Sequence, residues 1–496
     1  MVIIFFVHLP QIKTIGMKKS LLLLLSMMIF GISSLYSIED NTLTVNEELI
    51  ISKKDPSDTI KKKNKIRTGW TFGALPSVSY DADLGFQYGA LANIYFFGDG
   101  SKYPEYLHSF YVEASYTTKR YGVFRFFYDS KYLIPNHRFT VDVSYLPDAM
   151  CDFIGYNGYQ SVYNAGWRDK KADDYITRAF YKFKRDLFRA SADIQGNLGG
   201  NWYWNAGIGV LGYNVGSVNL AMINKGKDSV NMLPMDVEGL YEKYVKWNII
   251  KKDEATGGWY PYLRGGITYD SRDRQQNPTK GIYTDVFLTY SAAFGEQNEY
   301  NNLKLNATFR HYVPVYKDYI NFSYRFALQM TTAGQTPFYM NSYWNTLYIQ
   351  RVLYEALGGG NTLRGVLRNR ILANGFAFAN VEMRFKVAKF DIKKEHFYIG
   401  LVPFLDAGMI TQSYELNKDE IIASIQENDP DFDLDNLSDY INFEKPEIFK
   451  PHFAAGLGLK VAMNDNFVLS VDWALPFDKR DNVKMANLYI KIGYMF

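Results

Sequence analysis

The stretch Gly358-Gly359-Gly360-Asn361-Thr362-Leu363-Arg364-Gly365-Val366-Leu367-Arg368 lies in a long connection between two runs of alternating apolar and polar residues, 319–330 and 373–387. Gly358, Gly359 and Gly360 remove side chains where the backbone must turn with positive φ or approach another backbone closely. Arg364, followed by Gly365, places a planar guanidinium on a tight loop tip, and such a head group favours a carboxylate that it can bind through two bonds. Taken alone, these residues are equally compatible with a glycine-rich surface loop and a solvated arginine.

Similar alternating runs continue on both sides of this connection, and glycine, asparagine, aspartate and proline clusters separate them. They predict sixteen strands, an even number that suits a bacterial single-chain membrane barrel. The predicted strands are 70–80, 85–97, 109–118, 121–130, 138–146, 176–197, 203–213, 259–269, 281–292, 302–312, 319–330, 373–387, 396–406, 452–462, 466–475 and 487–496. The fold class that they indicate is an all-β, 16-stranded antiparallel transmembrane β-barrel.

The lengths of the connections support this interpretation. If both termini lie on the periplasmic side, the turns 313–318, 388–395 and 463–465 lie inside and are short, whereas 214–258, 331–372 and 407–451 lie outside and are long. Outer-membrane barrels show this asymmetry. The connection 407–451 carries eleven acidic residues between Glu415 and Glu447, which indicates a solvated surface loop, with a cation or partner site as the alternative.

Composition limits the function classes. The 496 residues include 40 tyrosines, six histidines and one cysteine, and the net charge of +3 is too balanced to indicate nucleic acid as a partner. Lone Cys151 excludes an intrachain disulfide framework. We find no Gly-x-Ser-x-Gly elbow, metal cluster or nucleotide motif, so the sequence predicts no enzyme, no metal and no cofactor.

The amino-terminal part has the pattern of a targeting segment. Met17-Lys18-Lys19 is a charged start, Leu21 to Ile32 is a short apolar core, and small residues follow up to Ser37. We therefore assign residues 1–37 to a signal peptide and predict that translation starts at Met17. A short polar periplasmic tail over 38–69 follows, and then a barrel over 70–496 with its arginine-glycine loop at 331–372.

Strand phase predicts where the charged residues point. Glu382 shares a face with Asn380 and Arg384, opposite Val381 and Met383, and Asp406 lies opposite Leu405. Both carboxylates should therefore face the lumen from adjacent strands, where an inward-folded loop could place Arg364 between them. An ordinary polar lining of a wet interior is the alternative.

Several stretches resemble the BamA/TamA-type outer-membrane assembly superfamily, also called the bacterial surface antigen family. Leu363-Arg364-Gly365 resembles its Arg-Gly loop motif, and Tyr269 to Asp273 with Asn277 to Gly281 resembles its charged turn. Phe404 to Gly408, Asn380 to Phe385 and the terminal segment Leu488 to Phe496 resemble later motifs in the same order. The resemblance covers Trp70 to the carboxyl end, with two departures. Val366 stands where an aromatic is usual, and residues 38–69 are too few for one periplasmic POTRA domain, which predicts a barrel-only member.

The resemblance implies that the Arg-Gly loop braces the inner wall through Glu382 and Asp406. It also implies a periplasmic turn built from Asp270, Arg272 and Asp273, with Pro278 and Gly281 setting its geometry. That turn is equally compatible with an internally satisfied salt bridge and with a direct substrate contact.

The seam between the first and last strands carries the functional prediction. Pro76 cannot donate to a strand ladder, and Gly493 weakens the last strand, which ends at Phe496. We expect a weak seam that parts sideways and accepts an incoming strand by β-augmentation, in line with the lateral insertion that the resemblance implies.

The predicted function is therefore help with the insertion or export of outer-membrane or surface proteins in the outer membrane of a Gram-negative bacterium. The alternative is a passive channel or structural barrel. Expected partners are outer-membrane lipids including lipopolysaccharide, client outer-membrane proteins and lipoproteins.

Overall fold

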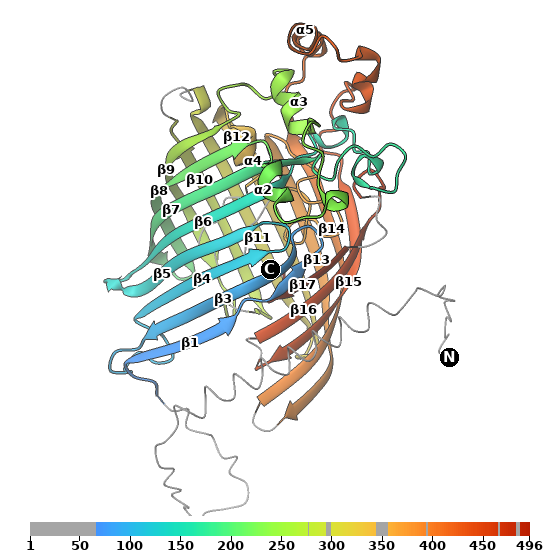
Figure 1. Cartoon of the computed structure of the whole chain (residues 1–496). Coiled ribbons are helices and arrows are strands. Elements are labelled where there is room, and N and C mark those ends of the chain that lie inside the picture. Colours follow the sequence, from blue (N-terminus) through green and yellow to red (C-terminus); the bar gives the residue numbers. More distant parts are fainter. Residues whose placement is uncertain are drawn as a thin grey trace, which may run out of the picture. The chain divides into compact units, whose positions relative to one another are not determined.

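The computed structural model describes residues 66–275, 277–293, 299–343, 356–392, 395–464, 467–482 and 487–496. Seventeen strand segments form one sheet in which every pair of neighbours is antiparallel, and the sheet closes on itself (Figure 1). Because β1 and β2 both pair with β3 and are two segments of one strand, the barrel has sixteen strands, as predicted. The predicted signal peptide and nearly all of the predicted tail lie outside the described residues.

The strands follow one another around the barrel in chain order. Their bounds are β1 Trp70–Pro76, β2 Ser79–Asp81, β3 Gly85–Phe96, β4 His108–Thr117, β5 Gly122–Ile134, β6 His137–Asp152, β7 Lys182–Gly199, β8 Trp202–Gly216, β9 Gly257–Asp270, β10 Gly281–Ser291, β11 Asn302–Tyr316, β12 Ile320–Gly334, β13 Gly375–Ile392, β14 Glu395–Gln412, β15 His452–Met463, β16 Phe467–Pro476 and β17 Asn487–Ile492.

Short helices occur in the long connections. They are α2 Leu220–Asn224, α3 Leu240–Lys246, α4 Phe338–Asn341 and α5 Lys418–Asn428, with single 3-10 turns at Gly158–Gln160, Gly166–Arg168, Ser229–Asn231 and Leu434–Asp439. No helix in the described part of the chain has the length and apolar composition needed to cross a bilayer.

The two faces of each strand differ as the alternation predicts. In β10, Val286 and Leu288 are 49% and 45% exposed on the outer face, whereas Asp285 and Thr289 are buried on the inner face. A barrel in lipid needs this arrangement, because all its backbone groups are paired between strands and its outer side chains contact hydrocarbon.

The two ends of the barrel also differ. The turns 317–319, 393–394 and 464–466 are short, and the connections 217–256, 335–374 and 413–451 at the opposite end are long. This matches the predicted asymmetry between short and long connections, and the end with the long connections is called the outer end below. Figure 1 shows α3 and α5 together at the end with the long connections.

Two predicted strands extend several residues outside the observed ones, whereas β5, β6 and β11 to β14 run four to six residues past their predicted carboxyl ends. Residues 176–181 belong to a connection, so β7 begins at Lys182 rather than at 176. The last strand ends at Ile492 instead of Phe496, because Gly493 has φ +96° and turns the chain. The prediction that this strand extends to Phe496 is therefore wrong.

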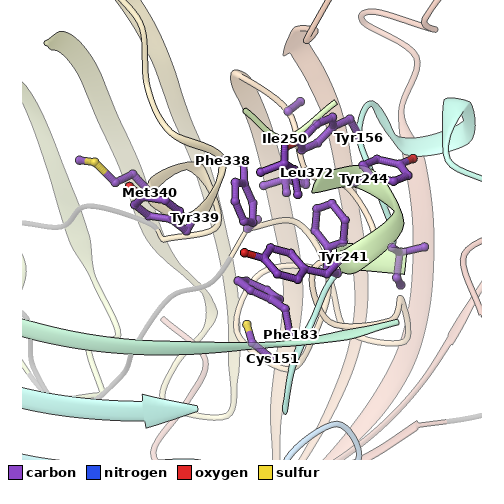
Figure 2. Close-up of a cluster of buried hydrophobic side chains, with 14 of the residues drawn as sticks. Cys151, Tyr156, Phe183, Tyr241, Tyr244, Ile250, Phe338, Tyr339, Met340 and Leu372 are labelled. Carbon is purple, nitrogen blue, oxygen red and sulfur yellow. The ribbon is translucent and has the colours of Figure 1, made fainter. Parts of the chain in front are cut away.

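An aromatic cap closes the outer end of the lumen. Its side chains come from the described parts of the connections 153–181, 217–256, 335–374 and 413–451, from strands β6 to β9 and β12 to β15, and from Ala293 and Tyr300. Figure 2 shows part of this cluster, including Phe183, Tyr244 and Phe338. The Phe153 ring lies at its centre, with ring centroids of Tyr244, Phe338 and Phe183 at 5.3, 5.5 and 5.9 Å. Burial of such rings is the main favourable term for ordering these connections.

The acidic connection takes part in this cap. Helix α5 buries Ile421 and Ile425 against the cap core, and Asp429 accepts hydrogen bonds from the Lys246 Nζ at 2.6 Å and the Trp247 Nε1 at 2.9 Å. The expectation of a solvated loop therefore holds only for the outer face of this connection.

Glu254 is the buried acid of the cap, only 7% exposed. Its carboxylate accepts the backbone N–H of Phe338 at 3.2 Å and that of Lys251 at 3.4 Å. Burial raises the pKa of Glu254 to about 7, since these two hydrogen bonds offset only part of the lost hydration.

Raising the pH should therefore loosen the cap. An acid with a raised folded pKa adds stability below its unfolded pKa, here 4.5, and this stability is lost as the pH rises through about 7. We expect the free energy of unfolding to fall by on the order of 3 kcal/mol over this pH range. It is measured by tryptophan fluorescence, to which Trp247 in the cap contributes, during unfolding at a series of pH values. Glu254→Gln should flatten this dependence and the exposed Glu447→Gln should not; identical profiles for Glu254→Gln and the wild type would contradict the assignment.

Candidate functional site

The connection 335–374 folds from the outer ends of β12 and β13 into the lumen. Its tip is a tight turn in which Gly358, Gly359 and Gly365 have φ of +116°, +84° and +93°. A Cβ at Gly358 would lie 1.9 Å from the carbonyl oxygen of Leu367, so only glycine fits there. The Thr362 hydroxyl accepts the Gly358 N–H at 3.1 Å and closes the turn. The sequence thus forms a rigid tip that presents Arg364.

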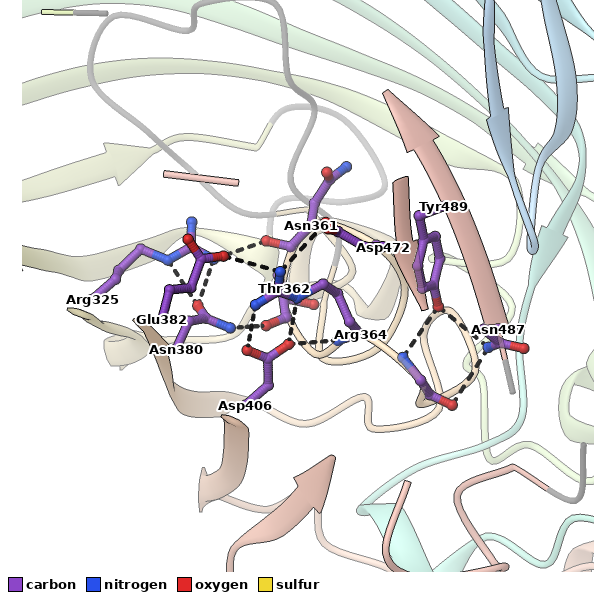
Figure 3. A network of polar contacts seen from close by, with 12 residues as sticks. Arg325, Asn361, Thr362, Arg364, Asn380, Glu382, Asp406, Asp472, Asn487 and Tyr489 are labelled. Carbon is purple, nitrogen blue, oxygen red and sulfur yellow. Dashed lines mark hydrogen bonds and ion pairs between the residues drawn. The ribbon is translucent and has the colours of Figure 1, made fainter. Parts of the chain in front are cut away.

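Arg364 lies between carboxylates of the inner wall, with no exposed surface (Figure 3). Its Nε and Nη2 donate to the two oxygens of Asp406 at 2.8 and 2.9 Å, and its Nη1 donates to Glu382 Oε1 at 3.0 Å. The backbone N–H of Arg364 also donates to Asp406, at 3.1 Å. The structure therefore brings together the arginine and both carboxylates that strand phase placed in the lumen.

A third carboxylate completes the site. Asp472 on β16 lies 3.4 Å from the Nη1 of Arg364 and pairs with the ammonium group of Lys460 on β15. The Phe404 ring lies against the guanidinium, 3.4 Å from ring centroid to Cζ. Sequence reasoning missed Asp472 and Lys460 as partners, although both are charged residues at inward positions of their predicted strands.

The charges of this buried site balance. Arg384 on β13 is bound to the second oxygen of Glu382 at 2.8 Å, so Arg364, Arg384 and Lys460 face three carboxylates. Burial alone would lower the pKa of Arg364, but Asp406 and the other two carboxylates outweigh it and raise the pKa further above its usual range. Such a cluster is stable only while all partners remain, because removing one leaves an uncompensated buried charge.

Further contacts hold the loop tip on both sides of Arg364. Arg325 Nη2 donates to the carbonyl of Asn361 at 3.0 Å, and Asn380 Nδ2 donates to that of Thr362 at 2.9 Å (Figure 3). The N–H of Gly365 donates to the Tyr489 hydroxyl at 3.2 Å. Val366, the departure from the usual aromatic, is fully buried in the apolar cluster of the cap.

The charged side chains at the turn between β9 and β10 are bound by neighbouring residues. Arg272 donates two bonds to Asp270 at 2.9 and 2.8 Å, and Asp273 accepts the N–H and hydroxyl of Thr279 at 3.0 and 2.6 Å. Gly281 has φ +104°, and Pro278 precedes Thr279 in the turn. Asn277 also donates to the Tyr398 hydroxyl on β14 at 3.1 Å, and Thr279 accepts a hydrogen bond from Asn321 on β12. A substrate contact of this turn stays a prediction.

The closing seam is short. Among the described residues, β17 pairs with β2 at two positions, Tyr489 with Asp81 and Ile490 with Tyr80, and none of the described pairs joins β17 to β1. Pro76 ends β1 at the break between the two segments of the first strand. Glu113, which sequence reasoning missed, anchors this break by accepting the Ser77 hydroxyl at 3.1 Å. A cavity of about 210 Å³ lies behind the seam, lined in part by Ser77, Glu113 and Gly360.

The last three residues turn into the lumen after Gly493. The Tyr494 and Tyr398 hydroxyls are 3.1 Å apart, and Arg384 Nη2 donates to the backbone oxygen of Phe496 at 2.9 Å. Phe496 is 8% exposed and packs on Tyr312. The structure thus places the predicted seam residue Phe496 on the inner wall rather than at the seam.

Comparison with known proteins gives a family match. The Omp85 superfamily domain matches residues 108–496, and no curated protein matches the chain. One similar solved structure is BamA from Haemophilus ducreyi lacking POTRA domains 1–3, with 14% identity, a TM-score of 0.49, and coverage of 87% of this chain and 73% of that chain.

CdiB from Escherichia coli is also similar, with 12% identity, a TM-score of 0.47, and coverage of 85% of this chain and 62% of that chain. CdiB from Acinetobacter baumannii has 11% identity and a TM-score of 0.44, with coverage of 86% of this chain and 60% of that chain. The chain thus spans about three-fifths of the length of each CdiB chain.

A closed sixteen-stranded barrel with an apolar outer face and an arginine-glycine loop bound inside its lumen defines a transmembrane β-barrel with an inward-folded loop. The chain belongs to the Omp85 superfamily, whose domain matches most of its length. This membership places the barrel in the outer membrane of a Gram-negative bacterium.

Arg364→Ala should destabilise the barrel without preventing its formation. The change strands Asp406 and Glu382 without their partner, at a cost of about 3–5 kcal/mol, while the strand ladders stay intact. In detergent gels the folded band should convert to the unfolded band at a lower temperature than in the wild type. Lys450→Ala, which removes an exposed ion pair with Glu447, is the matched control and should change little. An unaltered transition in Arg364→Ala would contradict the clamp.

Proposed function

We propose that this barrel assists the insertion or export of outer-membrane or surface proteins through the seam between β2 and β17. The observation that carries the proposal is the two-residue closure, against six described pairs between β16 and β17 and eleven between β12 and β13. Each backbone group left unmatched in lipid costs several kcal/mol. Separating β2 from β17 therefore costs less free energy than separating either of these other pairs of strands.

A parted seam would offer an unpaired strand edge to a partner of matching chemistry. The partner would be an extended segment with alternating apolar residues, because it must pair with the edge and face lipid at the same time. The expected partners are client outer-membrane or surface proteins, with lipoproteins as possible accessory subunits and lipopolysaccharide in the surrounding leaflet. The family match supports a role in assembly or transport rather than covalent chemistry.

The alternative function is passive conduction. A cavity of about 810 Å³ lies at the periplasmic end of the lumen, lined in part by Asp270, Arg272 and Phe496, and it would admit water and ions from that side. The aromatic cap and the inner loop fill the opposite end. This filling weighs against steady conduction, so insertion is the preferred function.

A disulfide across the seam tests the proposal. In a Cys151→Ser background, Tyr80→Cys with Ile490→Cys joins paired positions of β2 and β17, whose Cα atoms in an antiparallel ladder should lie within disulfide reach. The purified barrel in liposomes is offered an unfolded outer-membrane barrel, and insertion is measured by the heat-modifiable gel shift of that client. We expect insertion by the reduced form and loss of insertion on oxidation.

The matched control joins Ile490→Cys to Val471→Cys, which are paired positions of β17 and β16. This bond leaves the seam free and should leave insertion intact in both redox states. Full insertion by the oxidised seam variant would overturn the proposal. Stable ion conductance with no insertion by any form would favour the passive channel.

A further inference from the structure

The inner loop, defined here as residues 356–374, holds both sides of the seam. It does so through two arginines that are close together in the sequence. Arg364 binds carboxylates of β13, β14 and β16, which lie on the β17 side. Arg368 reaches the β2 side, where its Nη2 donates to Asp148 Oδ2 on β6 at 2.7 Å and its Nη1 lies 3.8 Å from Asp152 Oδ2. Arg368 is 3% exposed and Asp148 is 1% exposed, so this contact is shielded from water like that of Arg364.

The glycine-rich chain just before Arg364 lies against the inner surface of the seam. Lys491 on β17 donates to the carbonyl of Gly360 at 2.7 Å. A Cβ at Gly360 would lie 2.8 Å from the Tyr489 ring and 2.9 Å from the Asp81 carboxylate, the residues of one of the two seam pairs. Only a glycine lets the loop approach the closure this closely.

The outer end of the seam is bridged in the same way. Arg370 donates to the carbonyl of Gly158 and the hydroxyl of Ser161, both at 2.8 Å, in the connection that follows β6. The same guanidinium donates to the carbonyl of Arg480 at 2.9 Å, in the connection between β16 and β17. The loop is therefore bonded to both sides of the seam along its length.

We propose that the segment Gly360–Arg370 is a clasp that keeps the seam closed, and that the seam parts when the contacts of Arg368 and Arg370 with the β6 side are released while Arg364 stays bound. This inference rests on the proposed function, because it assigns the control of that seam. Arg364 holds the loop to the β17 side through three buried carboxylates. Arg368 supplies a buried ion pair on the β2 side, with Asp148 at 2.7 Å, and is the contact chosen for the test.

The clasp predicts a local effect that a general stabilising role would not produce. In Arg368→Gln the seam should open more often while Arg364 still holds the loop tip. Amide hydrogen exchange reports such openings, because its rate follows the equilibrium between closed and open states. Peptides that contain 79–84 and 487–492 should therefore exchange roughly tenfold faster, the size expected for loss of one charged hydrogen bond. Peptides that contain 357–366 should keep their protection.

Arg125→Gln is the matched control. Arg125 Nε donates to Asp142 Oδ2 at 2.7 Å with both side chains buried, but this pair joins β5 to β6 on one side of the seam. Its loss should leave the exchange of the seam peptides unchanged. Asp148→Asn breaks the clasp from the opposite partner, and it replaces Arg368→Gln if that variant does not fold.

The experiment uses the full-length barrel in detergent micelles, with exchange followed by mass spectrometry. Faster exchange confined to the seam peptides supports the clasp. The same exchange in Arg368→Gln and Arg125→Gln, or faster exchange over the whole barrel, overturns it. If the seam peptides exchange faster but no variant inserts a client in liposomes, the clasp stands and the proposed function fails.

Discussion

A guanidinium with no access to water must be neutralised where it lies, and this requirement fixes the inner loop of the barrel. Arg364 meets it with a bidentate contact to Asp406, a bond to Glu382 and proximity to Asp472. These carboxylates come from three strands of the inner wall. The loop therefore has one position in which its charge is satisfied, and the glycine-rich tip exists to reach that position.

Most of the barrel follows from the sequence because the side chains of a strand alternate with a period of two. Once the apolar face is assigned to lipid, every other residue faces the lumen, and that phase is enough to place Glu382 and Asp406 on the inner wall. Asp472 has the same phase, but it is 108 residues from Arg364. Its part in the site depends on how far around the inner wall the loop tip reaches, from β13 to β16, which local alternation does not encode.

Other features depend on contacts that no local pattern reveals. The alternation of 487–496 predicts one uninterrupted strand, whereas Gly493 turns the tail inward and Tyr398 and Arg384 hold it there. The cap is similar, since Phe153 lies in the connection after β6, Tyr244 lies in helix α3 of another connection, and the two rings meet only in the folded barrel. The contacts of Arg368 and Arg370 with the β6 side belong to the same group.

The position of Arg384 links two distant parts of the chain. Glu382 divides its oxygens between Arg364 and Arg384, and Arg384 also binds the backbone oxygen of Phe496. Withdrawing the tail from the lumen changes the surroundings of Arg384, and hence the balance of charge on Glu382 that the loop tip experiences. Thermodynamic linkage makes this relation reciprocal, so whatever loosens the loop also changes the affinity of the barrel for its own carboxyl end. The loop tip and the tail of the chain are therefore joined by a path only two side chains long, Glu382 and Arg384.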